Sequence, residues 1–87
     1  MYKVKFNDKA AKSLSKIDNK IQQKIISYLE QPALLKNPKT FGKALLGDKK
    51  GSWRYRVNDY RIICHIIEKE LIVLALDIGH RKEIYRT

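Results

Sequence analysis

The chain has 87 residues, 44% of them hydrophobic and 32% charged, with a formal net charge of +10. This length allows one domain, spanning residues 1–87, with a single modest core, and the apolar content excludes a disordered chain. The single cysteine, Cys64, excludes an internal disulfide and is typical of a reducing compartment, so a cytoplasmic protein is expected. No apolar run approaches the ~20 residues of a membrane span. The N-terminus alternates charged and apolar residues, unlike a signal sequence.

The first half of the chain predicts one strand followed by two helices. Apolar side chains alternate with lysines over residues 2–6, which is typical of a half-buried strand. Residues placed to cap the helices are Asn7 or Asp8 for the first and the pair Asn19 and Gln22 for the second. The second helix should end at Gln31–Pro32. Beside the apolar face of both helices runs a basic stripe of Lys9, Lys12, Lys16, Lys20 and Lys24.

The second half predicts a loop followed by three strands. Residues 32–51 hold both prolines and three of the four glycines, so we expect a connecting loop with a short helical turn over 41–46. A period of two then predicts strands over 53–57, 60–67 and 71–78, with tight turns at Asn58–Asp59 and 68–70. The last strand is apolar on both faces and is expected inside the sheet. The fold class is α+β: an N-terminal strand, a two-helix hairpin and an antiparallel β-meander, with helices on one sheet face.

The two basic residue types are sorted along the chain. All five arginines lie at or after position 54, whereas eleven of the fourteen lysines precede position 50. Lysine carries a mobile point charge, but the planar arginine side chain grips phosphate through two parallel hydrogen bonds. The sorting predicts a phosphate-handling site in the second half. The overall charge suits nucleic acid, an anionic membrane surface or an acidic protein as partner.

The turn at Asn58–Asp59 is expected to bring Arg54, Arg56 and Arg61 together on one face of two paired strands, here called the arginine face. The apolar side chains that must then face the helices are Tyr55, Val57, Ile62, Cys64 and Ile66. This leaves the arginine face open, with Ile63 and His65 also on it. Three crowded guanidinium groups repel one another unless an anion supplies the missing charge.

Further residues near the C-terminus are expected to join this face. Gly79 should end the last strand and turn His80, Arg81 and Tyr85 towards the arginines. Such a cleft suits single-stranded RNA, with phosphates on the arginines and an unstacked base on Tyr85 or Trp53. Other candidates carry less chemistry: His65 is interpreted as structural or partner-contacting and Cys64 as a buried apolar residue, while Asp59 and Asp77 lack the partners of a metal site.

Three runs of sequence resemble the RelE branch of the RelE/ParE toxins: KALLG at 43–47, WRYRVNDYR at 53–61 and GHRKEIY at 79–85. The resemblance implies a RelE-like toxin of a type II toxin–antitoxin system that cuts messenger RNA in the ribosomal A site and so inhibits translation. In that reaction the ribose 2′-hydroxyl attacks the adjacent phosphate, and neither a metal nor another cofactor is needed. The remaining requirements are in-line positioning, positive charge at the phosphate and proton transfer.

The resemblance also implies roles for individual residues. Arg61 takes the position that stabilises the transition-state phosphate, Arg81 the position of a phosphate contact and leaving-group acid, and Tyr85 the position that orients the nucleotide. The other expected RNA contacts are Trp53, Arg54, Arg56, Lys82 and Arg86.

The chain departs from the family at Arg54 and Arg56, whose positions hold lysines in well-known members, one of them proposed as general base. Arginine is a very poor proton acceptor, so Arg56 is expected to clamp phosphate instead. His80 is the natural alternative base, because imidazole titrates near pH 6.5. The identity of the proton acceptor stays open.

The expected partners are the ribosome with its messenger RNA and an acidic, RelB-like antitoxin, but no membrane. The toxin alone is expected to be a monomer that becomes heteromeric with its antitoxin, through exposed apolar strand residues Ile63 and Val73. Two alternatives have the same fold: a ParE-like gyrase inhibitor that does not cut RNA, and an inactive relative that only binds antitoxin and DNA.

Overall fold

The structure is a computed structural model that describes residues 1–47 and 51–80. Five strands form one sheet in the order β1-β5-β4-β3-β2. The strands are β1 (Lys3–Phe6), β2 (Lys43–Ala44), β3 (Trp53–Val57), β4 (Tyr60–Ile67) and β5 (Ile72–His80). β1 runs parallel to β5, and the other neighbours are antiparallel.

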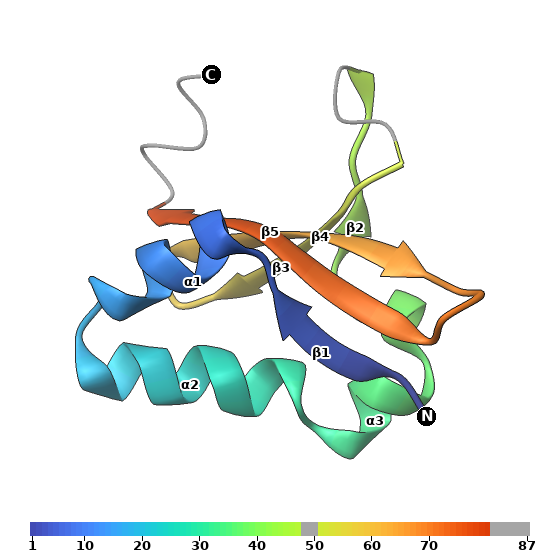
Figure 1. Ribbon diagram of the computed structural model, residues 1–87, viewed down its shortest axis with the longest axis horizontal. Coiled ribbons are helices and arrows are strands. Elements are labelled where there is room, and N and C mark those ends of the chain that lie inside the picture. The colour runs from blue at the N-terminus through green and yellow to red at the C-terminus, as the bar shows by residue number, and fades with distance from the viewer. Residues whose placement is uncertain (48–50, 81–87) are drawn as a thin grey trace.

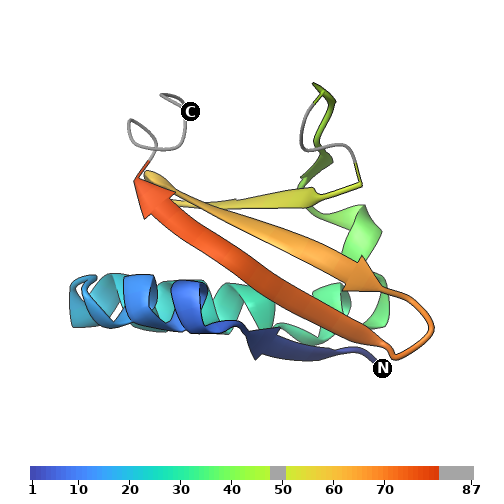
Figure 2. The same ribbon diagram turned by 45° about the horizontal axis from the view of Figure 1, so that its top comes forward.

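The helices lie on one side of this sheet (Figures 1 and 2). They are α1 (Asp8–Ser15), α2 (Asn19–Leu29), α3 (Pro32–Lys36) and the 3-10 turn η1 (Pro38–Thr40). This confirms the predicted α+β class. None of the described helices is long and apolar enough to cross a membrane.

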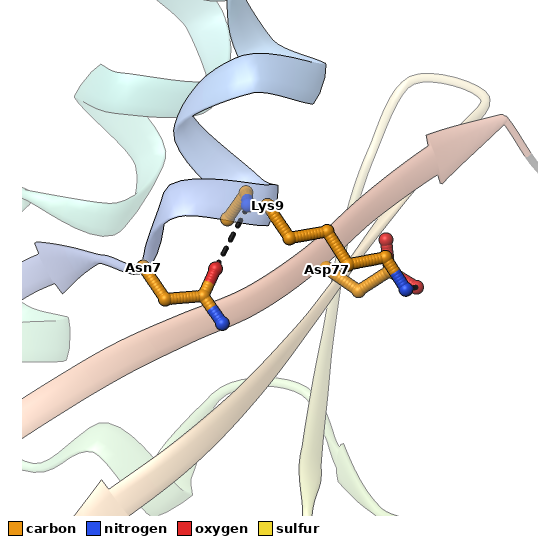
Figure 3. Close-up of polar contacts among 4 residues, drawn as sticks. Asn7, Lys9 and Asp77 are labelled. Carbon is orange, nitrogen blue, oxygen red and sulfur yellow. Dashed lines mark hydrogen bonds and ion pairs between the residues drawn. The ribbon is translucent and has the colours of Figure 1, made fainter.

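Side chains at the helix starts explain where α1 and α2 begin. The Asn7 side-chain oxygen accepts the Ala10 N–H at 2.8 Å, so Asn7 is the predicted cap of α1 (Figure 3). The predicted cap pair of α2 is wrong by one residue: Asp18 is the cap, and its carboxylate accepts the Lys20 N–H at 3.1 Å. The Gln22 side chain instead donates to the Ile17 carbonyl at 2.8 Å.

The segment 32–51 contains more structure than the predicted loop. Pro32 opens α3, where its fixed φ suits the first helical turn and its missing N–H is not needed. The helical turn expected over 41–46 is wrong, because β2 occupies that place. Two hydrogen bonds tie the segment to β3, from the Tyr55 hydroxyl to the Pro38 carbonyl at 2.7 Å and from the Trp53 indole N–H to the Phe41 carbonyl. These tertiary contacts, rather than local periodicity, order the part of the segment around Pro38 and Phe41.

The core lies between the helices and the sheet. Its fully buried side chains include Ile25 and Leu29 of α2, Tyr55, Ile62, Cys64 and Val73. As predicted, β5 is an internal strand, but it spans Ile72–His80, and Leu71 belongs to the preceding turn with φ 54°. The expectation that Ile63 and Val73 are exposed is wrong. Val73 is fully buried in the core, and Ile63 is only 4% exposed on the opposite sheet face.

Candidate functional site

The strand register brings the three sheet arginines together, as predicted. The turn at Asn58, whose φ is 54°, joins β3 to β4 and places Arg56 directly opposite Arg61, with Arg54 opposite Ile63. Residues facing each other in this way have Cβ atoms about 5 Å apart, and like charges there are unfavourable. The arginine face therefore concentrates positive charge where an anion would relieve the repulsion.

The three arginines differ in their exposure. Arg56 is exposed and Arg54 is half-buried, but Arg61 is only 3% exposed. The expectation of a fully open face is thus wrong at Arg61. Gly79 stands opposite Arg61 on β5. Positive charge held out of water acts more strongly on a nearby anion than charge in solvent.

The expected position of His80 is wrong. Gly79 does not end β5, which continues through His80 and pairs it with Tyr60. The two rings meet edge to face, with centroids 5.5 Å apart. Tyr60 packs against the core, and His80 lines a hollow of about 320 Å³ with Ser13, Lys16 and Ile17 near the end of α1. Strand alternation therefore places His80 on the helix-bearing side, away from the arginines.

Trp53 is also separated from the arginine face. Its position opposite Cys64 puts the indole on the helix-bearing side, where the ring N–H donates to the Phe41 carbonyl. Stacking of a base on Trp53 stays a prediction. The predicted site residues Arg81, Lys82, Tyr85 and Arg86 lie outside the described part of the chain, so their placement is likewise a prediction.

The remaining candidates from the sequence are Cys64, His65 and Asp77. Cys64 is fully buried, and burial raises the pKa of its thiol to about 12, which keeps it protonated near neutral pH. His65 is exposed on the arginine side of β4. Asp77 forms an ion pair with Lys9 at 3.5 Å (Figure 3). Among residues 1–47 and 51–80, no group of three or more His, Cys, Asp or Glu side chains is placed to hold a metal ion.

One feature near the arginines is missing from the sequence-based prediction. A hollow of about 270 Å³ is lined by Tyr28, Gly42, Lys43, Arg54 and Arg56. Lys43 stands opposite Arg54 in the register between β2 and β3. The available signal was the Gly42–Lys43 pair shortly before β3, but the sequence does not show that Lys43 pairs with Arg54.

A sheet covered by helices on one side, in this strand order, is the fold of a known class of small toxins. Residues 4–85 match the family described as ParE toxin of type II toxin-antitoxin system, parDE. The chain is 32% identical to Toxin RelE and 28% identical to Toxin RelG of Mycobacterium tuberculosis. Each comparison covers 98% of this chain, with 87% of Toxin RelE and 97% of Toxin RelG.

Solved structures show the same fold. The chain has a TM-score of 0.81 and 26% identity to a chain of the M. tuberculosis RelBE2 toxin–antitoxin complex, covering 92% of this chain and 98% of that one. For the isolated E. coli RelE toxin the TM-score is 0.76 at 20% identity, covering 99% and 93%. The chain belongs to the RelE/ParE family and is a toxin of a type II toxin–antitoxin system.

Proposed function

We propose that this toxin is an endoribonuclease of the RelE branch, which cuts messenger RNA in the ribosomal A site and so stops translation. The observation that carries the proposal is the pair Arg56 and Arg61, placed directly opposite each other beside Arg54. A phosphodiester held between such guanidinium groups meets concentrated positive charge where negative charge develops in the reaction. The arginine-to-lysine sorting of the sequence supports the same reading.

In the proposed reaction the 2′-hydroxyl oxygen attacks the adjacent phosphorus and loses its proton. The bond from phosphorus to the 5′-oxygen of the next nucleotide breaks, and that oxygen takes up a proton. The products are a 2′,3′-cyclic phosphate and a 5′-hydroxyl. Arg61, shielded from water, stabilises the pentacoordinate phosphate, and Arg56 clamps it from the facing strand. Arg81 as leaving-group acid and Tyr85 as nucleotide support complete the proposal.

The proton acceptor is neither of the two side chains considered from sequence. Arginine does not lose its proton near neutral pH. His80 lies on the helix-bearing side with Tyr60 and Lys16. We therefore assign the acceptor role to water or a ribosomal RNA group.

We also propose an acidic, RelB-like antitoxin as the partner in the cytoplasm, with the free toxin a monomer. Related toxins have been solved as complexes, namely M. tuberculosis RelBE2 and E. coli RelBE. A chain of charge +10 attracts an acidic segment. Because Ile63 and Val73 are buried, the apolar part of such an interface falls to exposed side chains such as Leu46, 83% exposed, and Leu71, 46% exposed.

A second candidate function is inhibition of gyrase without RNA cleavage. The family that matches residues 4–85 is named after the ParE toxin, and this favours the ParE-like candidate. The arginine face and the RelE and RelG relatives favour the nuclease.

The test is to incubate the purified toxin with ribosomes programmed with messenger RNA and, separately, with gyrase and supercoiled DNA. Cleavage in the A site that is lost in Arg61→Ala and Arg81→Ala supports the nuclease. Gyrase inhibition by protein that leaves the message intact would overturn it.

A further inference from the structure

The hollow at the outer edge of β3 has features that the proposed cleavage chemistry does not use. Its lining residues come from three places: Tyr28 from α2, Gly42 and Lys43 from the β2 end, and Arg54 and Arg56 from β3. At about 270 Å³ it lies just below the range of roughly 300–1,000 Å³ for ligand pockets. It therefore suits one unit of a longer ligand that continues onto the arginine face.

Among residues 1–47 and 51–80, neither Lys43 nor Arg54 forms an ion pair. Lys43 and Arg54 are directly opposite each other in the register, so two cations share one position of the sheet. The Arg54 Nε atom is buried and has no hydrogen-bond acceptor among the described residues. A buried N–H without an acceptor is costly, which indicates that an external acceptor belongs there.

Backbone groups add a second kind of contact. The two-residue turn makes Val57 and Tyr60 the hydrogen-bonded pair that closes the hairpin, so the backbone N–H and C=O of Arg56 point away from β4. β2 pairs with Trp53 and Arg54, and the edge of β3 at Arg56 lies beyond it. These groups are placed to bond a ribose hydroxyl or the edge of a base.

Gly42 allows the backbone beside the hollow to pack closely against β3. Its φ is 70°, and a Cβ added there would lie 2.2 Å from the Arg54 carbonyl oxygen and 2.9 Å from the Tyr55 ring. The close approach of backbone to backbone sets Lys43 against Arg54 and Tyr28 beside them.

We propose that this hollow is a second nucleotide subsite, which holds the RNA nucleotide next to the one being cut. Lys43 and Arg54 bind its phosphate, while the Arg56 backbone and Tyr28 contact its ribose and base. Arg54 and Arg56 are two residues apart on one strand, ~6.6 Å along it, comparable to the distance between successive phosphates of an extended strand. This inference rests on the proposed function for the identity of the ligand as RNA, but it concerns binding and not cleavage.

The test measures binding of the whole toxin to short RNAs made uncleavable by a 2′-deoxy group at the cut position. One nucleotide is added to either end of a common core. The wild-type protein should gain affinity at one end only, by roughly tenfold, as expected for one stacked and hydrogen-bonded base. Lys43→Gln and Arg54→Gln should lose most of this gain, and Lys43→Gln should also lower the salt dependence of binding by about one phosphate contact.

Lys36→Gln is the matched control, because it removes the same charge from an exposed position at the end of α3. It should keep the gain. A wild-type protein whose affinity does not change with added nucleotides overturns the subsite, whether or not it cleaves on ribosomes. Lys43→Gln that weakens antitoxin binding while leaving the nucleotide gain intact assigns the hollow to the antitoxin instead. If the wild-type toxin does not cleave RNA in the A site but still gains affinity from the added nucleotide, the nuclease is rejected and the subsite is supported.

Discussion

The His80 imidazole packs edge to face on the Tyr60 ring, with centroids 5.5 Å apart, at a paired position of β4 and β5. The contact fixes the imidazole on the helix-bearing side of the sheet, whereas Arg61, the neighbour of Tyr60 in sequence, projects to the other side. Adjacent residues therefore have different roles: Arg61 lies at the proposed reaction site, and Tyr60 packs against the core.

This arrangement predicts that His80 is not the proton acceptor. His80→Ala should leave the pH dependence of single-turnover cleavage unchanged, because no imidazole reaches the phosphate from the helix side. A base with an ordinary imidazole pKa would instead make the rate fall below about pH 6. If that fall is present in the wild type and absent in the variant, the assignment of His80 to the other face is wrong for the active complex.

Arg61 and Arg56 should differ in their effect on stability but not in the direction of their effect on cleavage. Arg61→Ala should lower the cleavage rate by about 10²-fold or more, the typical loss for a transition-state contact. It should also lower the free energy of unfolding by about 1–2 kcal/mol, because its side chain is buried. Arg56→Ala should slow cleavage with a change in stability within about 0.5 kcal/mol. Urea denaturation measures the free energy of unfolding of both variants. Equal stabilities for the two variants would contradict the burial of Arg61.

Burial of Cys64 predicts a loss of stability in alkali. Its pKa is raised from 9.0 to about 12 by burial, so between these values the unfolded chain loses the thiol proton and the folded protein keeps it. The free energy of unfolding should therefore be unaffected below pH 9 and fall above it, by up to about 1.4 kcal/mol per pH unit. Burial also raises the pKa of Tyr55, which adds to the fall at higher pH.

Cys64→Ala is the control for this prediction. It should remove the part of the fall that begins near pH 9, although it lowers stability at every pH by leaving a small cavity. Thiol alkylation should be slow in the native protein and fast in denaturant. An unchanged pH profile in Cys64→Ala would show that another group causes the fall.

Gly42 and Gly47 form a matched pair for testing close packing at the β2 edge. Both have positive φ, 70° and 68°, so alanine costs about 1–2 kcal/mol of backbone strain at either position. At Gly47 no atom of the described residues lies within 4 Å of the added Cβ, whereas at Gly42 the Arg54 carbonyl oxygen would lie 2.2 Å away. Gly42→Ala should therefore be more destabilising by at least about 1 kcal/mol. Thermal unfolding of both variants measures the difference, and equal melting temperatures would contradict the contact.

Antitoxin and RNA binding should respond differently to salt. An antitoxin complex that buries Leu46 or Leu71 should persist at ~0.5 M salt, because apolar burial is not screened. RNA binding should weaken steeply over the same range, because it is driven by the release of counterions from the RNA and this release is less favourable at high salt. Titrations of both partners across a salt series measure the two slopes. Equal slopes would leave a purely electrostatic competition between the partners.

The amino-acid sequence by itself determined the strands and helices outside residues 32–51 and which residues share a face of β3 and β4. Alternation of apolar and charged residues over 53–67 was sufficient to place Arg54, Arg56 and Arg61 together, because the period of a strand and the two-residue turn at Asn58–Asp59 are local properties. The Asn7 cap was likewise local. The resemblance over 43–86 indicated the family for the same reason, since its motifs are contiguous in the chain.

Tertiary packing alone decided the rest. Glycine is compatible with either ending or continuing a strand, so only pairing of β5 with β4 through Tyr60 showed that His80 faces the helices. The burial of Arg61 and Ile63 and the hollow beside Lys43 depend on residues far apart in the chain, such as Gly42 against Arg54. The burial of a residue depends on neighbours that several helices and strands contribute, so no single stretch of sequence predicts it.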